Sequence, residues 1–266
     1  MRDRITVLRW GNALAFAVLL GMNALANLAK LGGVTTGQVS AAYPNLFTPA
    51  PVTFAVWGVI YLLLAGFVVW QTGALHDWTS ESRTVVEKLG WWFVASCLLN
   101  AGWLVAWHFD QIGLSTLLIA GLLVVLAVLV GKTRKPDATK LDWLLWQAPF
   151  SLYFGWITVA TIANVTVWLT KRGWNGWGIA PATWMLVVLT VGALIAIAAI
   201  LRNRDWVYGL AVVWAYAGIL LRQLSSDGFG GAYPAIVVTV CLCIAALLTA
   251  MGRAIWDARR DRGAAR

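Results

Sequence analysis

The chain has 266 residues, of which 61% are apolar and only 12% are charged, and its net charge is +9. A soluble domain carries about a quarter charged residues, so this composition excludes an ordinary soluble protein. The positive charge does not indicate nucleic-acid binding, because the basic residues lie between long apolar runs and at the chain ends.

Eight apolar runs follow one another along the chain. Each is close to the roughly 20 residues that a helix needs to cross about 30 Å of hydrocarbon. The runs are continuously apolar and do not alternate, which favours helices over a barrel. In chain order they are Leu8–Leu28, Val52–Trp70, Leu89–Phe109, Ile112–Gly131, Leu144–Leu169, Ala180–Leu201, Trp206–Leu224 and Ala232–Trp256.

The distribution of basic residues predicts the topology. Of the 20 Lys and Arg, 16 lie at the termini and in alternate loops, and 4 lie in the opposite loops. By the positive-inside rule both termini face the cytoplasm, and an even number of spans agrees with that. We expect a bacterial cytoplasmic membrane protein with the lipid bilayer as its surroundings and no nucleic-acid partner.

The outer loop Leu31–Pro51 is the longest aqueous segment and contains three Gly and three Pro. Such residues punctuate a folded loop, not a flexible linker. Tyr43, Leu46 and Pro49 precede the second span, and we expect them to roof a site. On the other side, the polar segment His76–Lys88 is expected to be an inner loop.

The chain has 18 Trp, most of them at span ends, where indoles anchor helices at the headgroup level. Trp57, Trp103, Trp156 and Trp214 are expected to lie deeper. A deep indole N–H requires a hydrogen-bond acceptor, so each of these either packs against neighbouring helices or lines a cavity.

Polar side chains share helix faces with three of these indoles, at i, i+3 or i, i+4 spacing. With the predicted topology all of these groups lie in the outer halves of their spans, beneath the outer loop. The shared depth predicts a pocket. The alternative is that the Asn side chains only hydrogen-bond one helix to another. The candidate ligand-binding residues are Trp57, Tyr61, Asn100, Trp103, Tyr153, Trp156 and Asn164.

Several kinds of chemistry are missing from the pattern. No Asp, Glu, Lys or Arg lies in the middle of a span, which argues against ion-coupled transport. No His, Cys, Asp and Glu cluster has metal-ligand spacing, and no catalytic triad or carboxylate pair is recognisable. His108 and Asp110 are typical of a solvated turn. We therefore expect no catalytic residue, no metal site and no cofactor.

The first five spans resemble the TspO/MBR family of tryptophan-rich sensory and translocator proteins. The resemblance covers about residues 8–170 and rests on motifs in the same order as in the family. They are Tyr43-x2-Leu46-x2-Pro49 with Trp57-x3-Tyr61, Leu99-Asn100-x2-Trp103, and Tyr153-x2-Trp156-x3-Ala160-Thr161-x2-Asn164-x3-Trp168. The chain departs from the family in having Leu152, where the family has Pro, and Pro149 one turn earlier.

The eight apolar runs predict an all-α integral membrane protein with eight transmembrane helices, and the resemblance implies that the first five form a bundle of the family's kind. A TspO-like five-helix bundle would occupy residues 1–170, and three additional helices with a basic cytoplasmic tail would occupy residues 171–266. The resemblance also implies an outer-half pocket for porphyrin-like, haem-like or sterol-like ligands, lined by the candidate residues named above.

Three functions remain open. The first is a membrane sensor or regulator that binds a tetrapyrrole-like or other flat hydrophobic ligand. The second is a facilitative transporter of a small hydrophobic solute, and the third is a porphyrin-modifying enzyme, which the lack of a general acid or base disfavours. Gly192-x3-Ala196 permits close helix packing, either within the bundle or across a homodimer.

Overall fold

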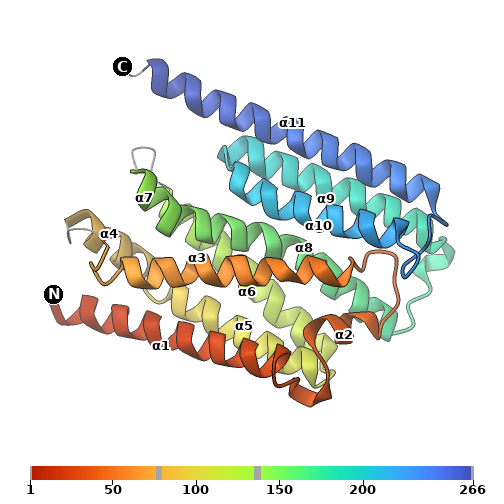
Figure 1. The fold of residues 1–266 in the computed structure, drawn as a ribbon, viewed down its shortest axis with the longest axis horizontal. Coiled ribbons are helices and arrows are strands. Elements are labelled where there is room, and N and C mark those ends of the chain that lie inside the picture. Colours follow the sequence, from red (N-terminus) through yellow and green to blue (C-terminus); the bar gives the residue numbers. More distant parts are fainter. Residues whose placement is uncertain (1, 76–79, 135–138, 265–266) are drawn as a thin grey trace.

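Figure 1 shows the computed structural model of the protein, which describes residues 2–75, 80–134 and 139–264. Two of the basic residues counted above, Lys135 and Arg266, lie outside these ranges, as does His76. The α-helices are α1 Arg2–Asn27, α2 Thr36–Ala41, α3 Val56–Trp70, α4 Ser80–Leu89, α5 Trp92–His108, α6 Ile112–Thr133, α7 Lys140–Asp142, α8 Ala148–Lys171, α9 Pro181–Asn203, α10 Trp206–Leu224 and α11 Pro234–Ala264.

The long helices lie side by side, and both chain ends lie at the same end of the bundle (Figure 1). The short helix α2 lies at the opposite end, which we call the outer end. Within the described ranges, seven helices are long and apolar enough to cross a membrane, and the number reaches eight if the bent pair α4 and α5 is one span. The predicted all-α membrane fold is confirmed.

The third span is bent, which the sequence analysis did not predict. Residues Ser80–Leu89, assigned above mainly to an inner loop, form α4. Gly90 has a φ of 50° and separates α4 from α5, and the segments Ser82–Leu89 and Trp92–His108 meet at 48°. The expectation of a simple loop was wrong because α4 is polar on one side only, and Val86 and Leu89 are buried on the other.

The fifth span begins with an irregular turn. Residues Trp143–Gln147 form a π-helical turn between α7 and α8, and the Ala148 N–H donates to the Trp143 carbonyl. Pro149 follows directly and has no N–H to continue the regular ladder, so a widened turn here keeps the neighbouring groups paired. The helix then continues without interruption to Lys171, which brings its outer half to the level of the outer loop.

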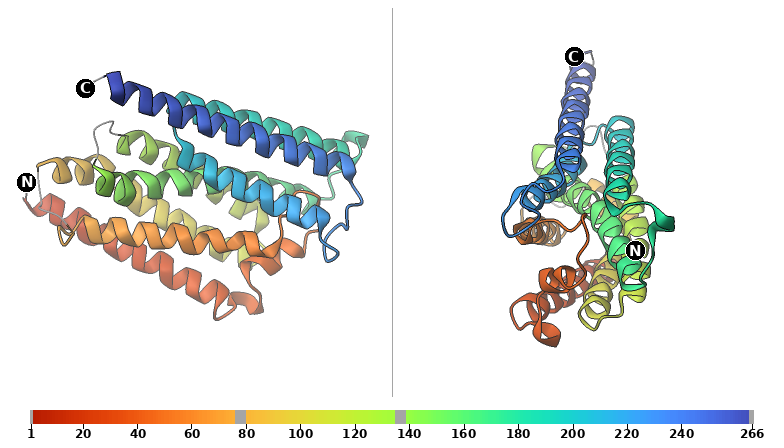
Figure 2. Two further views of the ribbon diagram at one scale, coloured as in Figure 1. Left: turned by 45° about the horizontal axis from the view of Figure 1, so that its top comes forward. Right: turned by 90° about the vertical axis from the view of Figure 1, so that its right-hand side faces the viewer.

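Among the last three helices, α10 makes the main contact with the first part of the chain. α10 packs on α8 on one side and on α11 and α9 on the other. Figure 2 shows the same order from two directions, with α11 on the far side of the bundle from α1. Gly192 and Ala196 of α9 are buried, and the Tyr216 hydroxyl of α10 lies against Gly192, so this small-residue pattern serves a contact within the chain.

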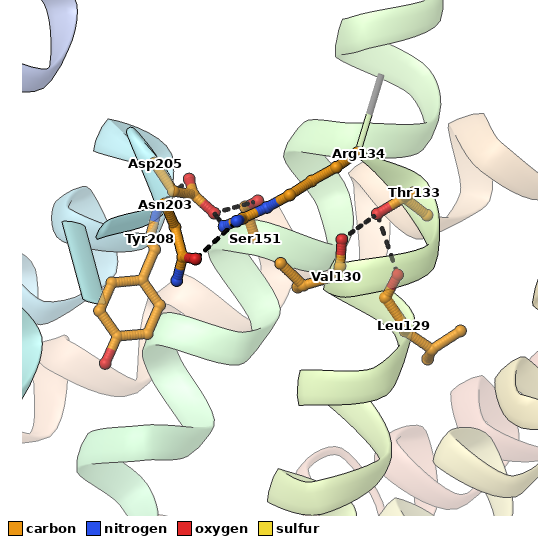
Figure 3. A network of polar contacts seen from close by, with 8 residues as sticks. All are labelled: Leu129, Val130, Thr133, Arg134, Ser151, Asn203, Asp205 and Tyr208. Carbon is orange, nitrogen blue, oxygen red and sulfur yellow. Dashed lines mark hydrogen bonds and ion pairs between the residues drawn. The ribbon is translucent and has the colours of Figure 1, made fainter. Parts of the chain in front are cut away.

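A polar network at the inner end joins α6, α8 and the turn between α9 and α10 (Figure 3). Asp205 accepts hydrogen bonds from the Ser151 hydroxyl at 2.7 Å and from the Tyr208 N–H at 3.1 Å, so it also caps α10. Arg134 donates to the Asn203 side chain at 2.6 Å and lies 3.9 Å from the Asp205 carboxylate. The network fixes where α10 starts relative to α8.

Candidate functional site

Trp57, near the outer end of α3, lies at the centre of the predicted residues. Its ring is stacked on that of Tyr61 at 5.4 Å between centroids and is tilted against that of Trp103 at 5.9 Å. Tyr153 and Trp156 of α8 meet it edge-on at 5.9 and 6.1 Å. All seven candidate ligand-binding side chains are buried. The aromatic residues of α3, α5 and α8 thus lie together, as their shared depth in the sequence analysis predicted.

The amides in this region hydrogen-bond between helices. The Asn100 amide donates to the Tyr153 hydroxyl at 2.5 Å, and the Asn23 amide of α1 donates to the Tyr61 hydroxyl at 2.8 Å. These bonds tie α5 to α8 and α1 to α3. They correspond to the alternative considered from the sequence, in which the Asn side chains connect one helix to another.

Asn164 has the most complete set of partners. Its side-chain oxygen accepts from the Trp103 indole N–H at 2.8 Å, and its NH2 group donates to the Thr116 and Ser115 hydroxyls at 2.8 and 3.1 Å. The amide thus links α8 to α5 and α6. Because its polar atoms are occupied by the protein, Asn164 positions the Trp103 ring and is not available to address the polar edge of a ligand.

The aromatic side chains enclose a small cavity of about 40 Å³. Four of the seven candidates line it, namely Trp57, Trp103, Trp156 and Asn164, and so does Pro49 of the outer loop. The other three, Tyr61, Asn100 and Tyr153, support the wall from behind through the contacts described above. Tyr43 and Leu46 do not line the cavity.

Two residues that line the cavity each have a buried polar atom with no hydrogen-bond partner among the described residues. These atoms are the indole N–H of Trp156 and the hydroxyl of Thr36, in α8 and α2 respectively. Buried polar groups are nearly always paired, so each such exception requires an explanation. A water or a ligand in the cavity would supply the missing partners.

A family model described as "TSPO-like protein" matches residues 9–253. The chain belongs to the TSPO-like family. The match continues through α9 and α10 into α11, whereas the motifs recognised in the sequence ended near residue 170. No match was found among curated proteins or among solved structures.

In this TSPO-like protein, α10 completes the cavity. Ala215 and Ile219 of α10 line the cavity, and so do Phe47 and Phe54, which lie close in sequence to Pro49. None of these four residues was among the candidate ligand-binding residues predicted from the sequence. Phe54 was recognisable by its position just before Trp57, but Ala215 and Ile219 are ordinary span residues and carried no signal.

Three hydrogen bonds hold the outer loop and the start of the second span against α10. The Ala50 N–H donates to the Gly218 carbonyl at 3.0 Å. The Gln223 amide donates to the Leu46 carbonyl at 2.9 Å, and the Trp214 indole N–H donates to the Thr53 carbonyl at 2.8 Å. Leu46 thus contributes to the roof through its backbone.

Tyr43 holds the other side of the loop. Its hydroxyl donates to the Asp110 carboxylate in the turn between α5 and α6, and Lys171 lies 2.7 Å from the same carboxylate. The hydrogen bond from Lys171, and then that from Tyr43, lowers the pKa of Asp110 below its usual value. Asp110 does not pair with His108, whose ring nitrogen Nδ1 lies 2.9 Å from the Leu104 carbonyl.

Proposed function

We propose that this protein is a membrane sensor or regulator that binds a flat hydrophobic ligand of the tetrapyrrole class in the outer-half cavity. The ligand class comes from the motif resemblance to the TspO/MBR family. The protein's membership of the TSPO-like family and its membrane fold are consistent with this role.

The unpaired indole N–H of Trp156 carries the proposal. Trp156 lines the cavity, and its ring meets both Phe54 and Trp57 edge-on at 6.2 and 6.1 Å. A ligand with a conjugated face and polar edge groups would stack against such rings and accept the free N–H. The Thr36 hydroxyl offers a second polar contact in the same wall.

The cavity is too small to hold a tetrapyrrole without rearrangement. Its volume of about 40 Å³ is far below the roughly 300–1,000 Å³ of typical small-molecule sites. Binding of a tetrapyrrole therefore requires the rings or the loop to move apart. The side chains that would move most readily are Phe47 and Phe54, because both belong to the loop side of the wall and not to the middle of a helix.

Titration of protoporphyrin into the purified protein, followed by quenching of tryptophan fluorescence, tests the proposal. Trp156→Phe keeps an aromatic face but removes the N–H, so binding should weaken about threefold to tenfold, as expected for one hydrogen bond. Trp156→Ala also removes the stacking face and should weaken binding tenfold or more, as a rough expectation.

Trp206→Phe is the matched control, because Trp206 lies at the inner end, stacked on Trp143 at 5.5 Å. It should leave binding unchanged. Equal weakening by Trp206→Phe and Trp156→Ala, with both proteins folded, would show that the ligand does not occupy the outer-half cavity. Counterflow of labelled porphyrin in proteoliposomes then separates binding from facilitated transport.

A further inference from the structure

A second, much larger pocket lies on the other side of α8, and the proposed function does not use it. Its volume is about 790 Å³, within the range of roughly 300–1,000 Å³ found for small-molecule sites. It forms because α9 packs on α11 and α10, and not closely on α8, so the outer halves of α8 and α9 leave a space between them. The turns before α9 and before α11 close its outer end.

Aromatic side chains frame the outer edge of this pocket. Trp174 and Trp184 line it and lie 5.3 Å apart, and Trp177 packs on both at 5.4 and 5.6 Å. Trp184 donates its N–H to the Gly176 carbonyl at 2.8 Å, which fixes the cluster to the turn. Phe229 contributes from the turn before α11.

The backbone at Trp177 is strained. Its φ is 55°, in the left-handed region that a bulky residue rarely adopts, and the Asn175 side chain holds it by accepting its N–H at 3.0 Å. Such strain persists where the surrounding structure enforces it, and it often marks a functional segment. The strained turn Gly173–Trp177 thus lies where three indoles, those of Trp174, Trp177 and Trp184, contact one another at the rim of the pocket.

The pocket wall selects against charge. The described residues that line it include no Asp, Glu, Lys or Arg, and most of the lining is apolar. An ionised ligand would lose its hydration without gaining a counter-charge, so its binding is disfavoured. A neutral molecule has no such penalty.

Threonine hydroxyls on α8 give the wall a specific polar character. Thr161 and Thr166 both line the pocket, and both donate their protons to carbonyls of their own helix, those of Ile157 and Ala163, at 2.7 Å. Their oxygens therefore have only lone pairs left to offer. A ligand group that pairs with them must donate a hydrogen, as an alcohol does and an ether does not.

We propose that the pocket between α8 and α9 binds a neutral, lipid-sized alcohol, with its apolar body between the two helices and its hydroxyl donating to the α8 threonines. The site is separate from the small cavity, since it lies on the opposite face of α8. Phe47 is the one side chain of the described residues that lines both.

Photolabelling tests this assignment in the full-length protein in nanodiscs. A hexadecanol with a diazirine in its chain is compared with its methyl ether and its phosphate monoester, which carry the same chain. We expect the alcohol to label α8 and α9 residues of the pocket about threefold to tenfold more than the methyl ether, since they differ by one hydrogen-bond donor. The phosphate ester should label it least.

Two variants sharpen the result. The double variant Thr161→Val/Thr166→Val keeps both side-chain shapes and removes both acceptors, so labelling by the alcohol should fall to that of the ether while the protein stays folded. Val165→Trp fills the pocket and should abolish labelling, whereas Val191→Trp on the exposed face of α9 should not. Equal labelling by the three probes would identify a groove filled by any lipid chain and overturn the proposal. Labelling elsewhere in the chain would overturn it as well.

Discussion

The carbonyl of Gly218 in α10 accepts a hydrogen bond from the N–H of Ala50 in the outer loop, at a distance of 3.0 Å. The contact is possible because position 218 has no side chain. A Cβ atom there would lie 1.9 Å from the hydroxyl oxygen of Thr53. The roof of the cavity and the last three helices thus meet at a point where even one methyl group does not fit.

Gly218→Ala should therefore push the loop away from α10. Overpacking of this kind costs about 1–3 kcal/mol, and we expect a lower midpoint of thermal unfolding in detergent. Gly252→Ala is the matched control, because a Cβ atom at position 252 of α11 would meet nothing within 4 Å. That change should stabilise the helix by about 0.5–1 kcal/mol. A Gly218→Ala protein as stable as the control would show that the close approach is absent.

The contact of Tyr43 and Lys171 with Asp110 predicts a pH dependence. Since the pKa of Asp110 is lowered in the folded protein, the carboxylate stabilises the fold at neutral pH, and this contribution is lost as the pH falls below the ordinary pKa of aspartate. Asp110→Asn removes the charge, and Asn tolerates the φ of 59° at this position. The variant should unfold at a lower temperature than the unmodified protein at neutral pH.

The same difference should vanish in acid, because the unmodified protein then has an uncharged carboxyl group at position 110. Unfolding midpoints of both proteins, measured across the pH range, check this. A difference that stays constant with pH would mean that the carboxylate charge has no role in holding the loop.

Reporter fusions test the topology. Both termini lie at one end of the bundle and α2 at the other (Figure 1), and the basic residues predict that the termini are cytoplasmic. A reporter fused after Arg266 should be active only if it functions in the cytoplasm, and one inserted near Gly37 only if it functions outside. Activity of both on the same side would contradict the eight-span arrangement.

Truncation tests whether residues 1–170 suffice, which stays a prediction. A chain that ends after Trp177 should still insert, because each remaining helix satisfies its own backbone. It loses Ala215 and Ile219 from the cavity wall and the three hydrogen bonds to the loop. We expect it to bind protoporphyrin more weakly, mainly through faster dissociation measured by stopped-flow. Complete loss of insertion would place the last three helices in the folding core.

The sequence predicted the spans well because each is a long apolar run between charged segments. It also predicted that Trp57, Trp103 and Trp156 meet, since residues on antiparallel helices reach the same depth when their distances from the outer end agree. It did not predict α4, because the charged residues of this segment are interspersed with the apolar residues that form its buried side. The contributions of Ala215 and Ile219 depend on how α10 packs against α8, and no local pattern encodes that.

The large pocket was also beyond the sequence. It arises from the divergence of α8 and α9, which is a property of the packing of four helices together. The turn Gly173–Trp177 that closes it has an unusual composition, with two Gly and two Trp, but such a turn is equally typical of an interfacial anchor.

The place of Phe47, between the small cavity and the large pocket, has a thermodynamic consequence. One ring serves two walls, so an occupant that moves the ring on one side changes the wall that faces the other occupant. Any such effect must be reciprocal: the factor by which a molecule between α8 and α9 alters affinity for a ligand beside Trp57 equals the factor in the reverse direction. A lipid-sized alcohol between α8 and α9 and a tetrapyrrole beside Trp57 would then each change the affinity for the other through a single phenylalanine.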